Sequence, residues 1–292
     1  SRSKNTSKLH LSHVSVQNDS LLAYFSRSKT DQTGSLPQHK SHIFANPFSP
    51  SLCPLLHLGL LLMEFDVGDD DFLFPGSAQQ TRYGDVLNHL FSQPGPVRDL
   101  MESLGLTPAD LGTHSVRKGA SSYACSGTPQ GVGIIAMCIR AAWKIGSVLQ
   151  RYLKHQDAGD CVAGRTLAGL PTNSQEFAIL PPHFDPLDPE ADHWLRACFR
   201  PTLLARRSLV PVLRLCFAQM VFHYDFLRDT LHDRHMLFTT QLFGDRNKVA
   251  DLKQRLIFDY TSPHMKATGI PVWVNLLQDM EKLSDRVEKL TE

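Results

Sequence analysis

The stretch from Gly112 to Tyr152 constrains this chain more than any other part of its 292 residues. It begins with G-T-H-S-V-R-K-G, which places His114 and Arg117 three residues apart. Residues with this spacing share one face of an α-helix. Thr113 is a suitable cap for the start of such a helix, and Gly127 is a suitable end. The pattern therefore predicts a helix that presents a histidine and an arginine together.

A tryptophan and a tyrosine follow this predicted helix. Trp143 comes after an apolar helical segment at residues 134–139, and Tyr152 lies in the sequence K-I-G-S-V-L-Q-R-Y-L, which predicts a short helix. An arginine guanidinium matches phosphate oxygens with two parallel hydrogen bonds, and a tyrosine hydroxyl can act as a covalent nucleophile. The stretch lacks the carboxylate pair of a glycosidase and the nucleophile-elbow glycines of a hydrolase. These residue types favour chemistry on a phosphodiester.

The order H-S-V-R-K-G, then a tryptophan, then R-Y-L resembles the catalytic core of the tyrosine recombinases, enzymes that break and rejoin DNA. This residue pattern is most similar to that of the crypton-like group of eukaryotic mobile elements. The resemblance implies an α+β, mostly α-helical fold with a small antiparallel sheet near the N-terminus. It covers roughly residues 1–180, and a proline-rich segment then precedes a helical C-terminal extension at residues 190–292.

The resemblance also implies roles for four side chains. Tyr152 would attack a phosphodiester and form a 3′-phosphotyrosine link, which frees a 5′-hydroxyl. Arg117 would bind the non-bridging oxygens, His114 would act as general base, and Trp143 would hold the phosphate through its indole N–H. Because the covalent link conserves the bond energy, the reaction needs neither ATP nor a metal ion or other cofactor.

Two further catalytic positions follow from the same resemblance. Arg2 matches the first catalytic arginine by its spacing before the first strand. Lys29 lies between a predicted strand at residues 20–26 and a return strand at 42–45, where the family has a lysine that acts as general acid. A frayed terminal arginine and a solvated turn lysine are the alternative interpretations.

Local charge favours DNA as the partner, although the whole chain has a net charge of only +1. Residues 111–165 contain seven lysines and arginines and only two acidic residues. Within this segment we expect Lys118, Arg140, Lys144 and Arg151 to contact the backbone of double-stranded DNA. Acidic residues gather instead at 64–71, which predicts a solvated loop away from the DNA.

The remaining composition indicates an intracellular protein. The six cysteines are scattered and form no C-x-x-C pair, which favours a reducing compartment, and a DNA enzyme of a eukaryote would act in the nucleus. The most apolar run, residues 55–63, is too short to span a bilayer. His223, Asp225, His232 and His235 lack a second ligand pair, so we predict no metal site.

Periodicity predicts further helices at residues 54–65, 81–92, 97–106, 192–199, 211–231 and 246–258. The glycine-rich segment 157–171 is expected to be irregular, and Tyr123 is expected to be packed. Near the C-terminus an apolar seam repeats at alternating steps of four and three residues, namely Leu276, Met280, Leu283, Val287 and Leu290. This spacing fits a packed terminal helix or a coiled-coil dimer equally well.

One departure from the family limits the expected activity. The chain starts at the first arginine, without the N-terminal helical domain that closes a clamp around DNA in the family. We therefore expect weak recombination by this chain alone, although related enzymes act as homotetramers on two DNA sites. A non-catalytic DNA-binding domain derived from a mobile element, and a helical interaction protein that works through its C-terminal half, are the competing interpretations.

Overall fold

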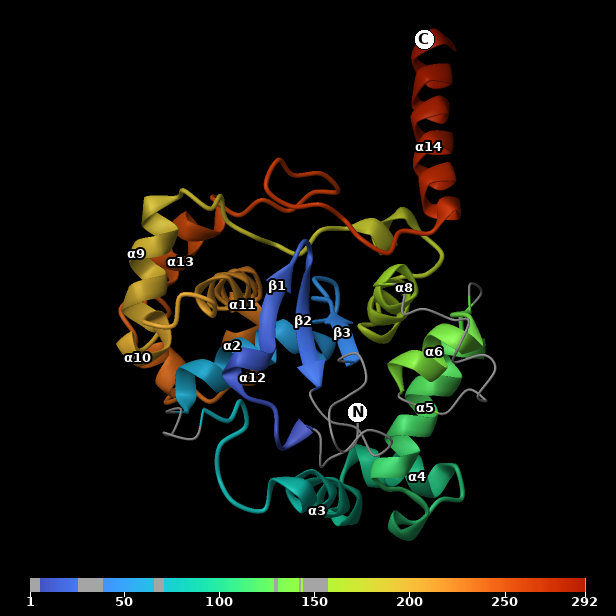
Figure 1. Cartoon of the computed structure of the whole chain (residues 1–292), viewed down its shortest axis with the longest axis vertical. Coiled ribbons are helices and arrows are strands. Elements are labelled where there is room, and N and C mark those ends of the chain that lie inside the picture. The colour runs from blue at the N-terminus through green and yellow to red at the C-terminus, as the bar shows by residue number, and fades with distance from the viewer. Residues whose placement is uncertain are drawn as a thin grey trace.

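The computed structural model describes residues 6–25, 39–65, 71–128, 131–141, 143 and 157–291. In this part of the chain, helices surround one small antiparallel sheet (Figure 1). The fold is α+β and mostly helical, as the sequence predicted.

The sheet consists of β1 (Val14–Gln17), β2 (Ser20–Phe25) and β3 (His39–Ile43), in the order β1-β2-β3. A two-residue turn joins β1 to β2, and Asn18 adopts φ 52° there, a conformation that asparagine tolerates better than most residues. The predicted strand at 20–26 is confirmed. The return strand also exists, but it begins and ends a few residues earlier than predicted.

The main core lies between the sheet and two apolar helices, α2 (Pro54–Glu64) and α11 (Val210–Phe222). Gly59 allows the two helices to approach closely, because a Cβ at this position would lie 2.8 Å from the sulfur of Met220. Around them lie α9 (Pro189–Cys198), α10 (Pro201–Leu204), α12 (Tyr224–Thr230) and α13 (Arg246–Lys253). The same core cluster contains residues from the first strands and from α9 to α13.

The predicted boundary between residues 180 and 190 therefore does not separate two hydrophobic cores. The physical reason is α11, which is buried on almost every side from Val212 to Val221. A helix that is apolar on all its faces needs neighbours on all sides. For α11, some of these neighbours, the sheet and α2, come from the N-terminal part of the chain.

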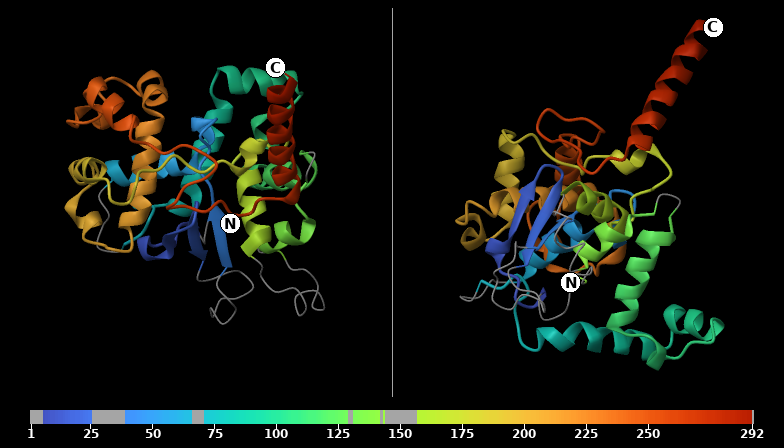
Figure 2. Two further views of the ribbon diagram at one scale, coloured as in Figure 1. Left: turned by 90° about the horizontal axis from the view of Figure 1, so that it is seen from above. Right: turned by 45° about the vertical axis from the view of Figure 1, so that its right-hand side comes forward.

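A second group of helices forms what we call the helical arm: α3 (Gln79–Ser92), α4 (Pro96–Ser103), α5 (Thr113–Ser126) and α6 (Ile134–Arg140). Figure 2 shows α3 and α4 extending away from the sheet. The predicted helices in this region are confirmed within two or three residues at each end. The cap of α5 is Gly112 rather than Thr113, which is the first helical residue.

The glycine-rich segment after residue 157 is a helix, so the prediction of an irregular segment was wrong. This helix, α8 (Asp157–Leu167), connects the arm to the sheet, because it packs against β3 on one side and α5 and α6 on the other. A Cβ on Gly164 would lie 2.4 Å from the carbonyl oxygen of His42. The glycines here permit close packing rather than turns, and only Gly169, with φ +80°, ends the helix in the conformation that glycine favours.

Short 3-10 helices complete the described fold: η1 (Leu11–His13), η2 (Pro50–Leu52), η3 (Pro108–Asp110), η4 (Gln175–Ala178) and η5 (Met236–Thr239). The last helix, α14 (Val272–Thr291), projects from the body (Figure 1). Across the described residues, no helix combines the length and the apolar character that crossing a membrane requires.

Candidate functional site

The residues that we predicted for phosphate chemistry and that the structure describes lie on and beside α5. Gly112 is fully extended, and the helix starts immediately after it. The helix is anchored by Ala124, which is buried against Met137 of α6 and Ala163 of α8. His114 and Lys118 lie exposed near the start of the helix, one turn apart, and Arg117 is half-buried.

Arg117 and Trp143 are brought together although 26 positions separate them in the sequence. The guanidinium carbon of Arg117 lies 5.6 Å from the centre of the Trp143 ring, within the range of a cation–π interaction. The same guanidinium donates a hydrogen bond to the carbonyl oxygen of Ala141. The backbone N–H of Trp143 donates to the carbonyl of Cys138 at 2.9 Å, so the turn after α6 holds the indole beside α5.

The indole is still accessible, since 37% of Trp143 is exposed. A guanidinium beside a partly exposed tryptophan brings together two residue types that can donate hydrogen bonds to a phosphate. The predicted His114 lies one helical turn before Arg117 on the same face of α5.

Arg140, which we expected to contact the DNA backbone, is mostly buried by other parts of the protein. Its guanidinium donates to a carboxylate oxygen of Asp160 at 2.7 Å and to the carbonyl oxygen of His42 at 2.9 Å, and only 13% of its side chain is exposed. The sequence could not show this, because the partners lie 20 and 98 positions away. Arg140 therefore ties α6 to α8 and β3.

Tyr123 is also placed differently from the prediction that it is packed. It is 44% exposed on α5, because only one face of this helix is covered by α6 and α8. The remaining predicted residues, Arg2, Lys29, Lys144, Arg151 and Tyr152, lie outside the described residues.

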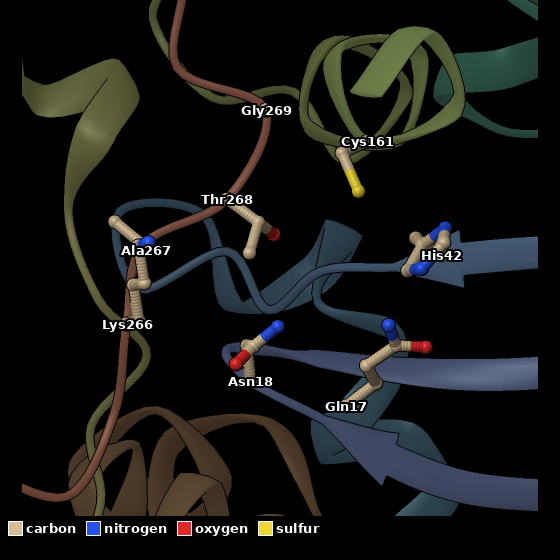
Figure 3. Close-up of a pocket in the computed structure, with 8 residues that line it drawn as sticks. All are labelled: Gln17, Asn18, His42, Cys161, Lys266, Ala267, Thr268 and Gly269. Carbon is tan, nitrogen blue, oxygen red and sulfur yellow. The ribbon is translucent and has the colours of Figure 1, made fainter. Parts of the chain in front are cut away.

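A pocket of about 330 Å³ lies beside α8, at the end of the sheet (Figure 3). It is lined by Gln17 of β1, Asn18 of the β1–β2 turn, His42 of β3, Cys161 of α8 and the segment 266–269. The sequence did not predict this pocket, because no local motif connects four segments so far apart.

The imidazole of His42 is held in its charged form. Its Nδ1 lies 2.9 Å from the Asp160 carboxylate, which also accepts the His42 backbone N–H at 2.7 Å. Burial lowers the pKa of His42, but hydrogen bonds to Asp160 and Cys161 outweigh burial and raise that pKa to about 9. Burial acts to raise the pKa of Asp160, and its bonds to His42 and Arg140 bring it below its usual range. Lys266 also lines the pocket, on the side opposite His42 (Figure 3).

A buried ion pair supports the wall of this pocket. Arg165 of α8 and Asp19 of the β1–β2 turn are both fully buried and form a salt bridge. Asp19 also accepts the Thr268 hydroxyl at 2.6 Å, and Arg165 donates to the carbonyl oxygens of Thr268 and Phe177 at 2.7 Å. This network joins the sheet, α8, η4 and the segment before α14.

None of the described residues forms a group of three or more histidines, cysteines, aspartates or glutamates that could hold a metal ion. His223, one of the residues weighed for metal binding, is buried on the core side. Burial, followed by the charge of Lys253, lowers its pKa to about 4, so it stays neutral at physiological pH. No family model, curated protein or solved structure matches this chain.

Proposed function

We propose that this chain binds duplex DNA and transfers a DNA strand to a tyrosine, as the tyrosine recombinases do. Tyr152 is the nucleophile, Arg117 and Arg2 bind the non-bridging oxygens of the scissile phosphate, and Trp143 donates a hydrogen bond to it. His114 is the general base and Lys29 the general acid. The link to the tyrosine keeps the phosphate activated, so reversal of the same step rejoins the strand.

The contact between Arg117 and Trp143 is the observation that supports this proposal. The resemblance to the tyrosine recombinases assigns both residues to one phosphate. The structure then gives a guanidinium lying 5.6 Å from the indole ring, between two different elements. Two surface residues without a shared role would not be expected to contact each other in this way. The exposed Lys118 adjoins this pair on α5 and adds positive charge for the DNA backbone.

A pooled suicide substrate tests the proposal without knowledge of the target site. The pool consists of duplexes with a randomised centre, each with a nick one base beyond a possible cleavage site. Attack at that site releases a short fragment that carries the 5′-hydroxyl. Rejoining is then impossible, and the covalent adduct is trapped. We expect a protein band that shifts under denaturing conditions and that disappears in Tyr152→Phe. Tyr123→Phe is the matched control, because it removes an exposed phenol from α5 and should leave the adduct intact.

A non-catalytic DNA-binding domain is the second candidate, and the hydrogen bond from Arg117 to the Ala141 carbonyl favours it. An arginine committed to the backbone and to an indole can stabilise the arm without any phosphate. Salt-dependent binding of the pooled duplexes with no adduct in any variant would establish this second candidate.

A further inference from the structure

The projecting helix α14 carries an apolar stripe that the body of the protein does not cover. Leu276, Met280, Leu283, Val287 and Leu290 are between 57% and 86% exposed. Only the first turn is held, where Val274 is fully buried and the Trp273 ring lies 5.9 Å from that of Phe177. The described structure therefore does not bear out the packed-helix interpretation of this segment.

The stripe is complementary to itself when two copies run in opposite directions. Its steps of four and three residues place Trp273, Met280 and Val287 at a positions of a heptad repeat and Leu276, Leu283 and Leu290 at d positions. In an antiparallel pair, Met280 lies opposite Leu283 of the second copy, and Leu276 lies opposite Val287. The outermost layer brings Leu290 against Trp273, whose ring is only half-buried by its own body.

Charge complementarity selects this direction. The two g positions flanking the exposed stripe are Asp279 and Arg286. In the antiparallel register above, each Asp279 faces Arg286 of the other copy, and the pair occurs twice by symmetry. In a parallel pair the g positions would face the e positions Ser284 and Thr291, which carry no charge.

Other occupants fit this helix less well. The polar face carries four acidic and three basic residues between 272 and 291, whereas a helix that lies on an anionic membrane needs a basic face. A projecting helix also gains little from intrinsic propensity alone, so a partner that covers its stripe would stabilise it.

We propose that two copies of this chain associate through α14 as an antiparallel two-helix coiled coil. This inference does not rest on the proposed DNA chemistry, because none of the residues assigned to that chemistry lies on α14. In this dimer the remainders of the two copies lie at opposite ends of the paired α14 helices.

Sedimentation of the full chain between about 1 and 100 µM tests the association. We expect a monomer–dimer equilibrium in this range. Leu283→Asp, which places a charge in both central layers, should leave a monomer throughout. Glu281→Ala, on the opposite face of the same helix, should sediment like the wild type. Because Leu283 is exposed in the monomer, both variants should unfold at the wild-type temperature when measured at low concentration.

Charge reversal tests the direction. Asp279→Arg and Arg286→Asp should each weaken dimerisation about tenfold, because each creates two like-charge pairs across the interface. The double variant should recover most of the affinity, although it does not restore the intrachain pair between Asp279 and Lys282, which lie 3.6 Å apart.

A wild-type chain that stays monomeric at about 100 µM would overturn the association. Single reversals with no effect would overturn the antiparallel direction, since a parallel pair puts Ser284 and Thr291 opposite these charges. Single reversals whose effects add in the double variant would also overturn it, because that result would place the charges against different neighbours.

Discussion

The core around α11 and the helical arm differ in how their side chains are used. In the core, α2 and α11 bury almost every apolar residue, and the polar groups near the sheet are paired. In the arm, apolar side chains such as Val86, Leu100 and Val116 remain exposed, and so do His114 and Lys118 on α5. Stability and the proposed chemistry therefore reside in different regions, which can be altered separately.

The largest effect on stability should come from the buried ion pair. Asp19→Asn leaves the Arg165 guanidinium fully buried without its counter-charge, and we expect a loss of about 3–5 kcal/mol in the free energy of unfolding. Denaturant titration would measure it. Burial raises the pKa of Asp19, and the charge of Arg165 and the hydrogen bonds from Thr268 act in the opposite direction. A loss below about 1 kcal/mol would mean that water reaches this pair.

Close packing of α8 should give the next largest effect. Gly164→Ala puts a methyl group 2.4 Å from the His42 carbonyl oxygen, so α8 must shift away from β3 at a cost of about 1–3 kcal/mol. Gly159→Ala is the control on the same helix. Its new methyl group would lie 3.3 Å from the Ala136 side chain, and the gain in helix propensity should offset most of that strain. Equal losses for the two variants would contradict the predicted difference in packing.

His42 predicts a pH dependence for the sheet region. Its folded pKa of about 9 lies above the usual 6.5, so the folded state binds the proton more tightly than the unfolded state. This contribution is fully present below pH 6.5 and is lost as the pH rises towards 9. His42→Gln should flatten that part of the profile of unfolding free energy. His223, with a folded pKa of about 4, acts in a separate range: as the pH falls from 6.5 towards 4, the unfolded state binds a proton that the folded state does not, so stability decreases.

The smallest effect on stability should come from the arm residues proposed for chemistry. Arg117→Ala removes a partly exposed cation–π contact and should cost less than about 1 kcal/mol in unfolding free energy. Trp143→Phe keeps an aromatic ring beside Arg117 but removes the indole donor, so it should cost still less. Both variants should lose adduct formation on the pooled duplexes by at least about tenfold. Unchanged adduct yields would remove this pair from the proposed site.

Local signals were sufficient for several elements of the fold. The helix α2 was predicted from its apolar run and from Pro54 in its first turn, and the strand β2 from its β-forming residues. The helix α8 was missed because its glycines resemble those of a loop, and only the neighbouring His42 carbonyl explains them. A proline-rich connector indicates a change in local structure, so the segment 180–190 did not reveal that the main core contains residues from both sides of it.

For the site, local spacing placed His114 and Arg117 on one helix, and the order of motifs brought Trp143 into the same group. The inward turn of Arg140 could not be predicted, because it depends on Asp160 and on the His42 carbonyl across the sheet. The pocket beside Cys161 was missed for the same reason. Side chains that act through long-range partners leave no signal in a single sequence.

Mass spectrometry of a trapped protein–DNA adduct tests the central claim most directly. After nuclease treatment and proteolysis, the nucleotide should remain on one peptide, and fragmentation should place it on Tyr152 among the six tyrosines of the chain. A nucleotide attached to Tyr123 or another residue, or DNA binding without any adduct on the pooled nicked duplexes, would contradict the proposed strand transfer.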